Sequence, residues 1–365
     1  MGHDYQNRLA RAAKEAAAAN LDALVITPSP DLLYLIGYDA PLLERLTALI
    51  ARASGSPLLI VPELERPRAA VSPAGKLLDI ETWRDGEDPF DVVARVLSDG
   101  QRFGAADRMW AMHLLGFQRA LPSSTFVLAS VVMNRLRIRK DEGEVELLGR
   151  AGRSADDTFD VITREGLSGQ REEAISRKLS ELLVQNGCES AAFAIVGSGP
   201  NGASPHHEAG ERTIESGDAV VLDFGGRVGG YCSDMTRTVS VGEPPAEKKE
   251  VHEIVRQAQE AAFQAVRPGV PAEEIDRAAR RVISDAGYGD RFIHRIGHGI
   301  GLEEHEHPYI VEGNSEPLEP GMCFSIEPGI YLEGRFGVRI EDIVTVTEDG
   351  AVRLNNAPRE LTVVT

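Results

Sequence analysis

The segments ESGDAVVLDFGGRVGGYCSDMTRTVSV (215–241) and EPGMCFSIEPGIYLEGRFGVRIEDIVTV (319–346) decide the fold of this chain. Each contains two apolar stretches separated by a glycine-rich turn, which predicts a β-hairpin. Each hairpin carries one carboxylate on each strand, namely Asp223 and Asp234 in the first and Glu327 and Glu341 in the second. The sequence therefore predicts two related units that each supply a pair of acids.

The residues before each hairpin strengthen the case for a duplication. Residues 146–187 and 253–287 both show a helical pattern, a glycine-centred break and a second helical pattern that ends near a glycine. In both second helices the apolar residues recur at helical period and form one buried stripe. A pseudo-twofold pairing of the two units would bring the four carboxylates of their antiparallel hairpins to a shared centre.

Clustered acids repel one another, and a buried ion costs several kcal/mol or more unless a cation neutralises it. His298, in the string RIGHGIG (295–301), adds an imidazole to the four acids. Carboxylate-rich ligation suits hard or borderline ions. We therefore expect a site for two divalent metal ions, Mn²⁺ in particular, with Zn²⁺ and Co²⁺ as alternatives. Such a pair can activate water and polarise a carbonyl group.

Histidines are concentrated around these strings. Two lie in SPHHEAG (204–210) and four in FIHRIGHGIGLEEHEHP (292–308), out of nine in the chain. An imidazole suits proton transfer because its pKa lies close to neutral pH. We expect functional roles for His206, His298 and His305 and a substrate or supporting contact for His294, and we expect His207 and His307 to be bystanders.

The N-terminal part has a different order of predicted elements. Predicted strands at 22–27, 56–62 and 125–130 alternate with helical patterns. This alternation indicates an α/β domain. The charged stretch 135–148 predicts the entry into a long helix and a domain boundary. We therefore expect an α/β domain over 1–134 and an α+β catalytic domain over 135–365.

Composition excludes several classes of partner. The net charge of −18 argues against nucleic acid and against anionic membrane surfaces. The first twenty residues lack the apolar core of a signal peptide, and no run approaches the length of a membrane span. Three cysteines without CxxC spacing predict neither a disulfide framework nor a thiolate zinc site. We expect a cytoplasmic protein.

The acidic and histidine strings resemble those of the metallopeptidase family that includes prolidase (Xaa-Pro dipeptidase), aminopeptidase P and methionine aminopeptidase. The resemblance covers roughly residues 140–365 and implies the pita-bread fold, while the N-terminal α/β domain matches the creatinase-like domain of the first two enzymes. It implies metal ligation by five residues, with Asp234 and Glu341 as bridges: Asp223, Asp234, His298, Glu327 and Glu341. It also implies catalytic roles for His206, His305 and Glu327, and places near the substrate for His294, Tyr331 and Arg339.

One position departs from the family pattern. Some prolidases have an arginine four residues after the position of His305, where it pairs with the free carboxylate of a dipeptide, but this chain has Tyr309. We predict that Tyr309 takes part in substrate binding and that the chain hydrolyses Xaa-Pro dipeptides. The alternatives are an aminopeptidase that acts on longer peptides with proline second, a non-catalytic binding protein on the same fold, and a metal-independent amidinohydrolase. The resemblance also implies a homodimer.

Overall fold

The computed structural model describes residues 4–97 and 101–365. It divides into two compact units, Met1–Arg137 and Ile138–Thr365, and the division falls within the predicted boundary segment 135–148. None of the helices in the described residues is both long enough and apolar enough to cross a membrane.

The N-terminal unit is built around a six-stranded mixed sheet in the order β4-β3-β2-β1-β5-β6. β2 pairs antiparallel with β1 and β3, and the remaining neighbours are parallel. The strands are β1 (Ala23–Ile26), β2 (Ala48–Arg52), β3 (Leu58–Pro62), β4 (Asp79–Trp83), β5 (Arg102–Ala105) and β6 (Thr125–Leu128). The helices are α1 (Tyr5–Ala18), α2 (Pro30–Ile36), α3 (Arg66–Val71), α4 (Pro89–Val96), α5 (Ala111–Ala120) and α6 (Ser130–Arg137). The predicted α/β domain is confirmed.

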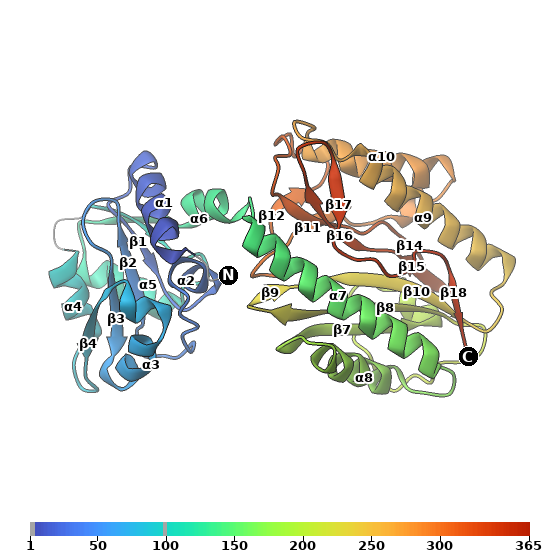
Figure 1. The fold of residues 1–365 in the computed structure, drawn as a ribbon, viewed down its shortest axis with the longest axis horizontal. Helices are drawn as coiled ribbons and strands as arrows, with labels where there is room; N and C mark the ends of the chain where they lie inside the picture. The colour runs from blue at the N-terminus through green and yellow to red at the C-terminus, as the bar shows by residue number, and fades with distance from the viewer. Residues whose placement is uncertain (1–3, 98–100) are drawn as a thin grey trace. The chain divides into compact units, whose positions relative to one another are not determined.

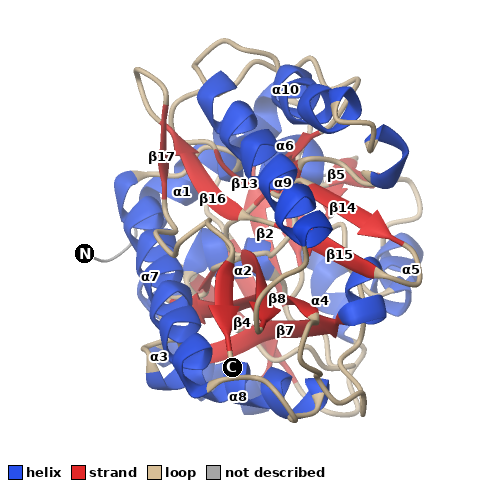
Figure 2. Ribbon diagram, turned by 90° about the vertical axis from the view of Figure 1, so that its right-hand side faces the viewer, coloured by secondary structure: helices blue, strands red, loops and turns tan. Residues whose placement is uncertain are grey.

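The C-terminal unit contains two successive helix pairs, as the duplicated pattern predicts. The helices are α7 (Glu142–Glu165), α8 (Glu172–Gln185), α9 (Ala246–Ala265) and α10 (Ala272–Asp285). A capping box starts α7, because the Asp141 side chain accepts from the Glu144 backbone and the Glu144 side chain accepts from the Asp141 backbone. The second helix of each pair has 14 residues. α8 and α10 lie on opposite sides of the strands of this unit (Figures 1 and 2).

Strands follow each helix pair. The first sheet has the order β18-β10-β8-β7 with β9 on β8, and the second has the order β12-β11-β13-β16-β17. The strands of the first are β7 (Ser190–Ser198), β8 (Ala219–Val228), β9 (Tyr231–Cys232), β10 (Met235–Val241) and β18 (Thr362–Val364). Those of the second are β11 (Gly297–Gly299), β12 (Glu306–Ile310), β13 (Cys323–Ile326), β16 (Asp342–Val346) and β17 (Ala351–Arg353). All pairs are antiparallel except β10 with β18.

The second acidic hairpin is more elaborate than the sequence suggests. β13 pairs with β16, but between them the chain forms a separate two-stranded ribbon of β14 (Gly329–Leu332) and β15 (Phe336–Arg339). Pro328 separates β13 from β14, and a proline cannot donate a hydrogen bond to a strand ladder. The expected single hairpin is therefore corrected to a hairpin with an inserted ribbon.

A buried arginine ties the two sheets together. Arg237, on β10, is 2 % exposed, and its Nη2 donates to Asp342 Oδ1 of β16 over 2.6 Å. Its Nη1 donates to the backbone oxygen of Glu341 over 2.6 Å, and its Nε donates to that of Pro358. Asp342 also accepts from Gln259 of α9. The guanidinium thus fixes the backbone next to a predicted metal ligand.

We predict that Arg237→Ala lowers the free energy of unfolding of the C-terminal unit by about 2–4 kcal/mol, because Oδ1 of the buried Asp342 and the backbone oxygen of Glu341 lose their donor, although Arg353 and Arg359 still pair with Oδ2 of Asp342. Urea denaturation followed by circular dichroism measures this change. The control is Arg164→Ala, which removes an exposed ion pair with Asp160 and should stay within about 0.5 kcal/mol of wild type. Equal midpoints for both variants would contradict a supporting role for Arg237.

Candidate metal centre

The first pair of acids is held by the β8–β10 pairing. Asp223 lies within β8, where its backbone is opposite Thr236 of β10, and Asp234 directly precedes β10. Asp223 is 8 % exposed and Asp234 is 4 % exposed. The pairing thus places Asp223 within the strand ladder and Asp234 directly beside its end, and both carboxylates are buried.

The second sheet supplies the remaining predicted ligands. His298 is the central residue of β11, Glu327 directly follows β13, and Glu341 directly precedes β16. A side chain at position 297 is sterically excluded, because a Cβ on Gly297 would lie 1.9 Å from the carbonyl oxygen of Ser325. This close approach, together with the hydrogen bond from the His298 backbone to Ser325 Oγ, fixes β11 against β13.

The structure brings all five predicted ligands together. Three overlapping groups each have ligand atoms within 4.8 Å of one another, and the groups are Asp223–Asp234–Glu341, His298–Glu327–Glu341 and Asp234–His298–His305. His298 Nε2 lies 3.3 Å from Glu327 Oε1 and 3.7 Å from Asp234 Oδ2. Asp234 and Glu341 each belong to two groups, and a carboxylate can bridge a pair of neighbouring ions because it offers two oxygens.

Unpartnered atoms test whether a metal fits these residues. Asp223 Oδ1 and Asp234 Oδ1 are buried and have no hydrogen-bond partner within the described residues. The other oxygen of Asp223 accepts from Arg339 Nη2 over 2.5 Å, and Glu341 Oε2 accepts from Thr236 Oγ1 over 2.7 Å. Buried carboxylate oxygens are rarely left unsatisfied. The donor set therefore fits bound cations, which the unpartnered oxygens would coordinate.

The pKa values of the acids also indicate that cations bind at this centre. Burial, followed by repulsion from neighbouring acids, raises the pKa of Asp234 well above its usual range, and the same two effects raise the pKa of Glu341. Burial also raises the pKa of Asp223, although the charge of Arg339 opposes it. One guanidinium cannot neutralise four acids, so the ionised cluster needs further positive charge.

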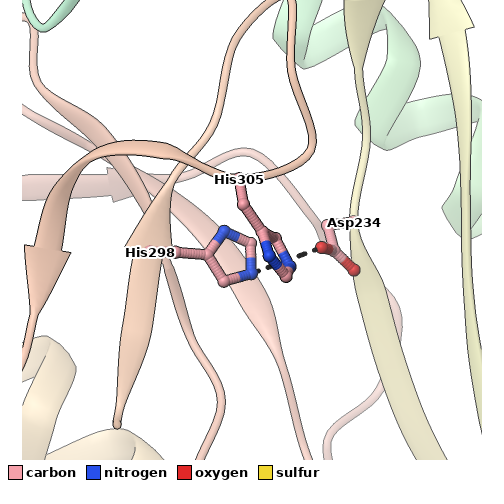
Figure 3. A group of neighbouring side chains, drawn as sticks. All are labelled: Asp234, His298 and His305. Atoms are coloured by element: carbon pink, nitrogen blue, oxygen red, sulfur yellow. Dashed lines mark ion pairs between the residues drawn. The ribbon is translucent and has the colours of Figure 1, made fainter. Parts of the chain in front are cut away.

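His305 lies at the edge of this cluster. Its ring centroid is 3.9 Å from that of His298, and the two imidazoles face the carboxylate of Asp234 (Figure 3). Although His305 is partly open to solvent, desolvation by its neighbours and then the charges of His298 and Arg295 lower its pKa to about 4. The imidazole is therefore neutral near pH 7 and can donate one hydrogen bond.

A cavity of about 850 Å³ opens onto the cluster. His206, predicted as catalytic, lines it together with His294, His305 and the five candidate ligands. Apolar side chains also contribute to the wall, namely Phe193, Ile195, Pro205 and Ile293. The cavity thus combines the acidic centre with an apolar surface of the kind that binds small ligands.

The predicted substrate contacts have well-defined partners. Arg339 donates to Tyr331 Oη over 3.0 Å, and Tyr331 Oη lies 2.8 Å from His294 Nε2. His294 Nδ1 is 2.7 Å from the carbonyl oxygen of Arg295, so it carries the proton and Nε2 accepts from Tyr331. Arg339 uses its remaining nitrogens on Thr236 and Asp223, which makes it a support for the acidic centre.

Tyr309 and Arg295 form a pair that sequence reasoning missed. The Arg295 guanidinium carbon lies 4.4 Å from the centroid of the Tyr309 ring, and Arg295 lines the cavity. Within residues 4–97 and 101–365 this guanidinium has no carboxylate partner. Arg295 lies beside His294 in the string that carries His298. The signal was present in the sequence, but only the fold brings the side chain next to position 309.

Comparisons with known proteins extend over both units. Residues 146–348 match the family described as metallopeptidase family M24, and residues 8–139 match the creatinase/prolidase N-terminal domain. The chain is 48 % identical to the probable dipeptidase PepE of Mycobacterium bovis, over 99 % of this chain and 96 % of the relative. It is 36 % identical to the Xaa-Pro dipeptidase of Lactobacillus helveticus, over 95 % of this chain and 96 % of the relative. The crystal structure of prolidase from Thermococcus sibiricus has a TM-score of 0.94 at 37 % identity and covers 100 % of both chains.

We predict that wild-type protein binds two Mn²⁺ ions per chain and that Asp234→Ala binds at most one, because this substitution removes an oxygen donor shared by two of the three groups. Inductively coupled plasma mass spectrometry after equilibrium dialysis gives the stoichiometry. Asp349→Ala removes an exposed acid and is the matched control. An Asp234→Ala protein that retains the wild-type stoichiometry would rule out the proposed ligand role.

Proposed function

This chain belongs to metallopeptidase family M24, and on that premise we propose that it is a prolidase-type dipeptidase that releases proline from Xaa-Pro dipeptides. The observation that carries the proposal is the convergence of Asp223, Asp234, His298, Glu327 and Glu341 beside one cavity. A non-catalytic binding protein would not need this complete set of buried ligands.

The five ligands would hold two divalent cations, for which we propose Mn²⁺. When bound, the cations would supply an activated water and polarise the carbonyl group of the scissile bond. The role of the ligand side chains is to fix these positions in advance, since Thr236 and Arg339 orient two of the carboxylates from behind. A centre that is already ordered needs little rearrangement during the reaction.

Three side chains would act on protons and on developing charge. Glu327, which lines the cavity, would accept a proton from the attacking water and pass it to the proline nitrogen. His305 would donate a hydrogen bond to the oxygen on which negative charge develops, and its neutral form at pH 7 leaves one N–H for that purpose. His206, which also lines the cavity, would contact the scissile region.

The cavity wall suits a proline ring. Proline has no N–H and a fixed φ, so recognition depends on shape and apolar contact rather than on a backbone hydrogen bond. Phe193, Ile195 and Ile293 supply apolar surface, and His294 is held in one orientation by Tyr331. We propose that this part of the wall, next to Arg295 and the Tyr309 ring that Arg295 contacts, selects proline in the second position.

A dipeptidase also needs a partner for the free carboxylate of its substrate, and we propose that Arg295 is this partner. The guanidinium lies against the ring at position 309 and lines the cavity. A guanidinium stacked on an aromatic ring keeps its in-plane N–H groups available for a carboxylate. Arg295 would therefore replace the charge that Tyr309 lacks.

The second candidate is an aminopeptidase that acts on longer peptides with proline in the second position. The presence of tyrosine instead of arginine at position 309 favours it. For the physiological setting we propose a homodimer, which the family resemblance implies and which sedimentation of purified protein can test, and we retain the cytoplasmic location predicted from the sequence.

We predict that Ala-Pro is hydrolysed faster than Ala-Pro-Ala, because the extra residue removes the carboxylate from the reach of Arg295. Ala-Ala should be turned over poorly, since it lacks the ring. Initial rates of metal-loaded enzyme, followed by chromatography of the products, provide the measurement. Faster turnover of the tripeptide would favour the aminopeptidase instead.

We predict that Arg295→Met lowers kcat/KM for Ala-Pro roughly 10- to 100-fold, as expected for the loss of a hydrogen bond to a charged group. The same variant should hydrolyse the amide Ala-Pro-NH₂ at the wild-type rate, because that substrate has no carboxylate. Arg335→Met, which alters an exposed arginine outside the cavity lining, is the control. An equal loss on the acid and on the amide would count against the assignment.

A further inference from the structure

A second buried acid, Glu172, lies outside the metal centre and has an unusual number of partners. It is the first residue of α8, and its side chain is 0 % exposed. Oε1 accepts from the backbone nitrogen of Ser198 over 2.7 Å and from Ser198 Oγ over 2.6 Å. Asn201 Nδ2 donates to both carboxylate oxygens over 3.1 Å, and His207 Nε2 lies 2.8 Å from Oε2.

These hydrogen bonds keep the carboxylate ionised in a buried place. Burial alone would raise the pKa of Glu172, but the hydrogen bonds from Ser198, His207 and Asn201 together lower it. A buried charge that is satisfied by several donors is stable, and removal of its charge leaves those donors unpaired. The cluster therefore holds its donor groups in one arrangement.

The side-chain donors all lie on one short segment, and the backbone nitrogen of Gly210, shortly after it, is 3.5 Å from Oε2 of Glu172. Ser198 ends β7, Asn201 lies in the 3₁₀ turn Gly199–Ala203, and His207 follows shortly after. The turn packs tightly on β15, because a Cβ on Gly337 would lie 1.9 Å from the carbonyl oxygen of Gly202. Glu172 thus accepts hydrogen bonds from three residues of the segment 198–207, and β15 packs against the 3₁₀ turn in the middle of this segment.

His206 lies within this segment. It lines the cavity over the metal centre, but it makes no hydrogen bond or ion pair of its own within the described parts of the chain. The position of the His206 side chain therefore depends on the backbone of the neighbouring residues. The adjacent His207 is the residue that binds Glu172. The sequence suggested a bystander role for His207, whereas the fold gives it a specific partner.

We infer that Glu172 is a positioning residue that acts through Ser198, Asn201 and His207 to hold His206 at the scissile bond. The inference rests on the proposed function, because it assigns His206 to the reaction. Since misplacement of a reacting group by about 1 Å can cost about 100-fold in rate, loss of the Glu172 charge should reduce turnover without touching the metal ligands.

A double-mutant cycle tests this coupling. Glu172→Gln keeps the size of the side chain but turns one acceptor oxygen into a donor, so at least one donor of the cluster loses its partner. We expect Glu172→Gln to lower kcat for Ala-Pro roughly 10- to 100-fold in the wild-type background and less than about threefold in the His206→Ala background. Metal stoichiometry should be unchanged in all four proteins.

Two control measurements separate positioning from a general loss of structure. Glu173→Gln makes the same chemical change on the next residue of α8, whose side chain is 42 % exposed, and should leave kcat at the wild-type value. His207→Ala should resemble Glu172→Gln, whereas His207→Gln should recover most of the rate, because its amide can still donate to Glu172. The two His207 variants test the positioning role even if Glu172→Gln does not fold.

Each outcome bears on a different claim. A wild-type enzyme that leaves Ala-Pro intact would count against the proposed function. An active wild type in which Glu172→Gln costs the same factor with and without His206 would overturn the positioning role alone. Full activity of Glu172→Gln, or equal losses in His207→Ala and His207→Gln, would overturn it as well.

Discussion

Mutual repulsion among buried carboxylates is the constraint on which the C-terminal unit depends. Asp223, Asp234, Glu327 and Glu341 line a single cavity, and burial, followed by the charges of neighbouring acids, raises the pKa values of Asp234 and Glu341. Such a cluster is unfavourable by itself and becomes favourable when cations are present. The surrounding fold can therefore be understood as a frame that holds the acids together against their repulsion.

The frame consists of hydrogen bonds that neighbouring side chains donate to the acids. Arg339 and Thr236 bind the outer oxygens of Asp223 and Glu341, and Arg237 binds the backbone of Glu341 from within the protein. The same principle is repeated away from the metal centre, where Glu172 organises the segment that carries His206. In both places a buried charge is used to fix backbone geometry, which apolar packing alone would leave less precisely defined.

The sequence predicted the acidic centre because its signals are local. Acids next to a glycine-rich turn, on a predicted strand or directly beside it, can be recognised without a structure, and the mixed α/β N-terminal unit follows from the alternation of its elements. The inserted β14–β15 ribbon was not predicted, because strand pairing across it joins residues that are distant in the chain. Arg295 and Glu172 were missed for a related reason, since only tertiary contacts distinguish them from ordinary surface charges.

The division of the ligands between the two sheets has a consequence for how such a protein can arise. Residues up to the end of β10 contribute only aspartates, and the later part contributes His298 and both glutamates. Neither half holds a complete coordination sphere, so a half-length ancestor could have built an equivalent centre only by pairing with a second copy. Fusion of the two copies would then have freed each half to diverge, which left one with oxygen donors alone and gave the other the imidazole.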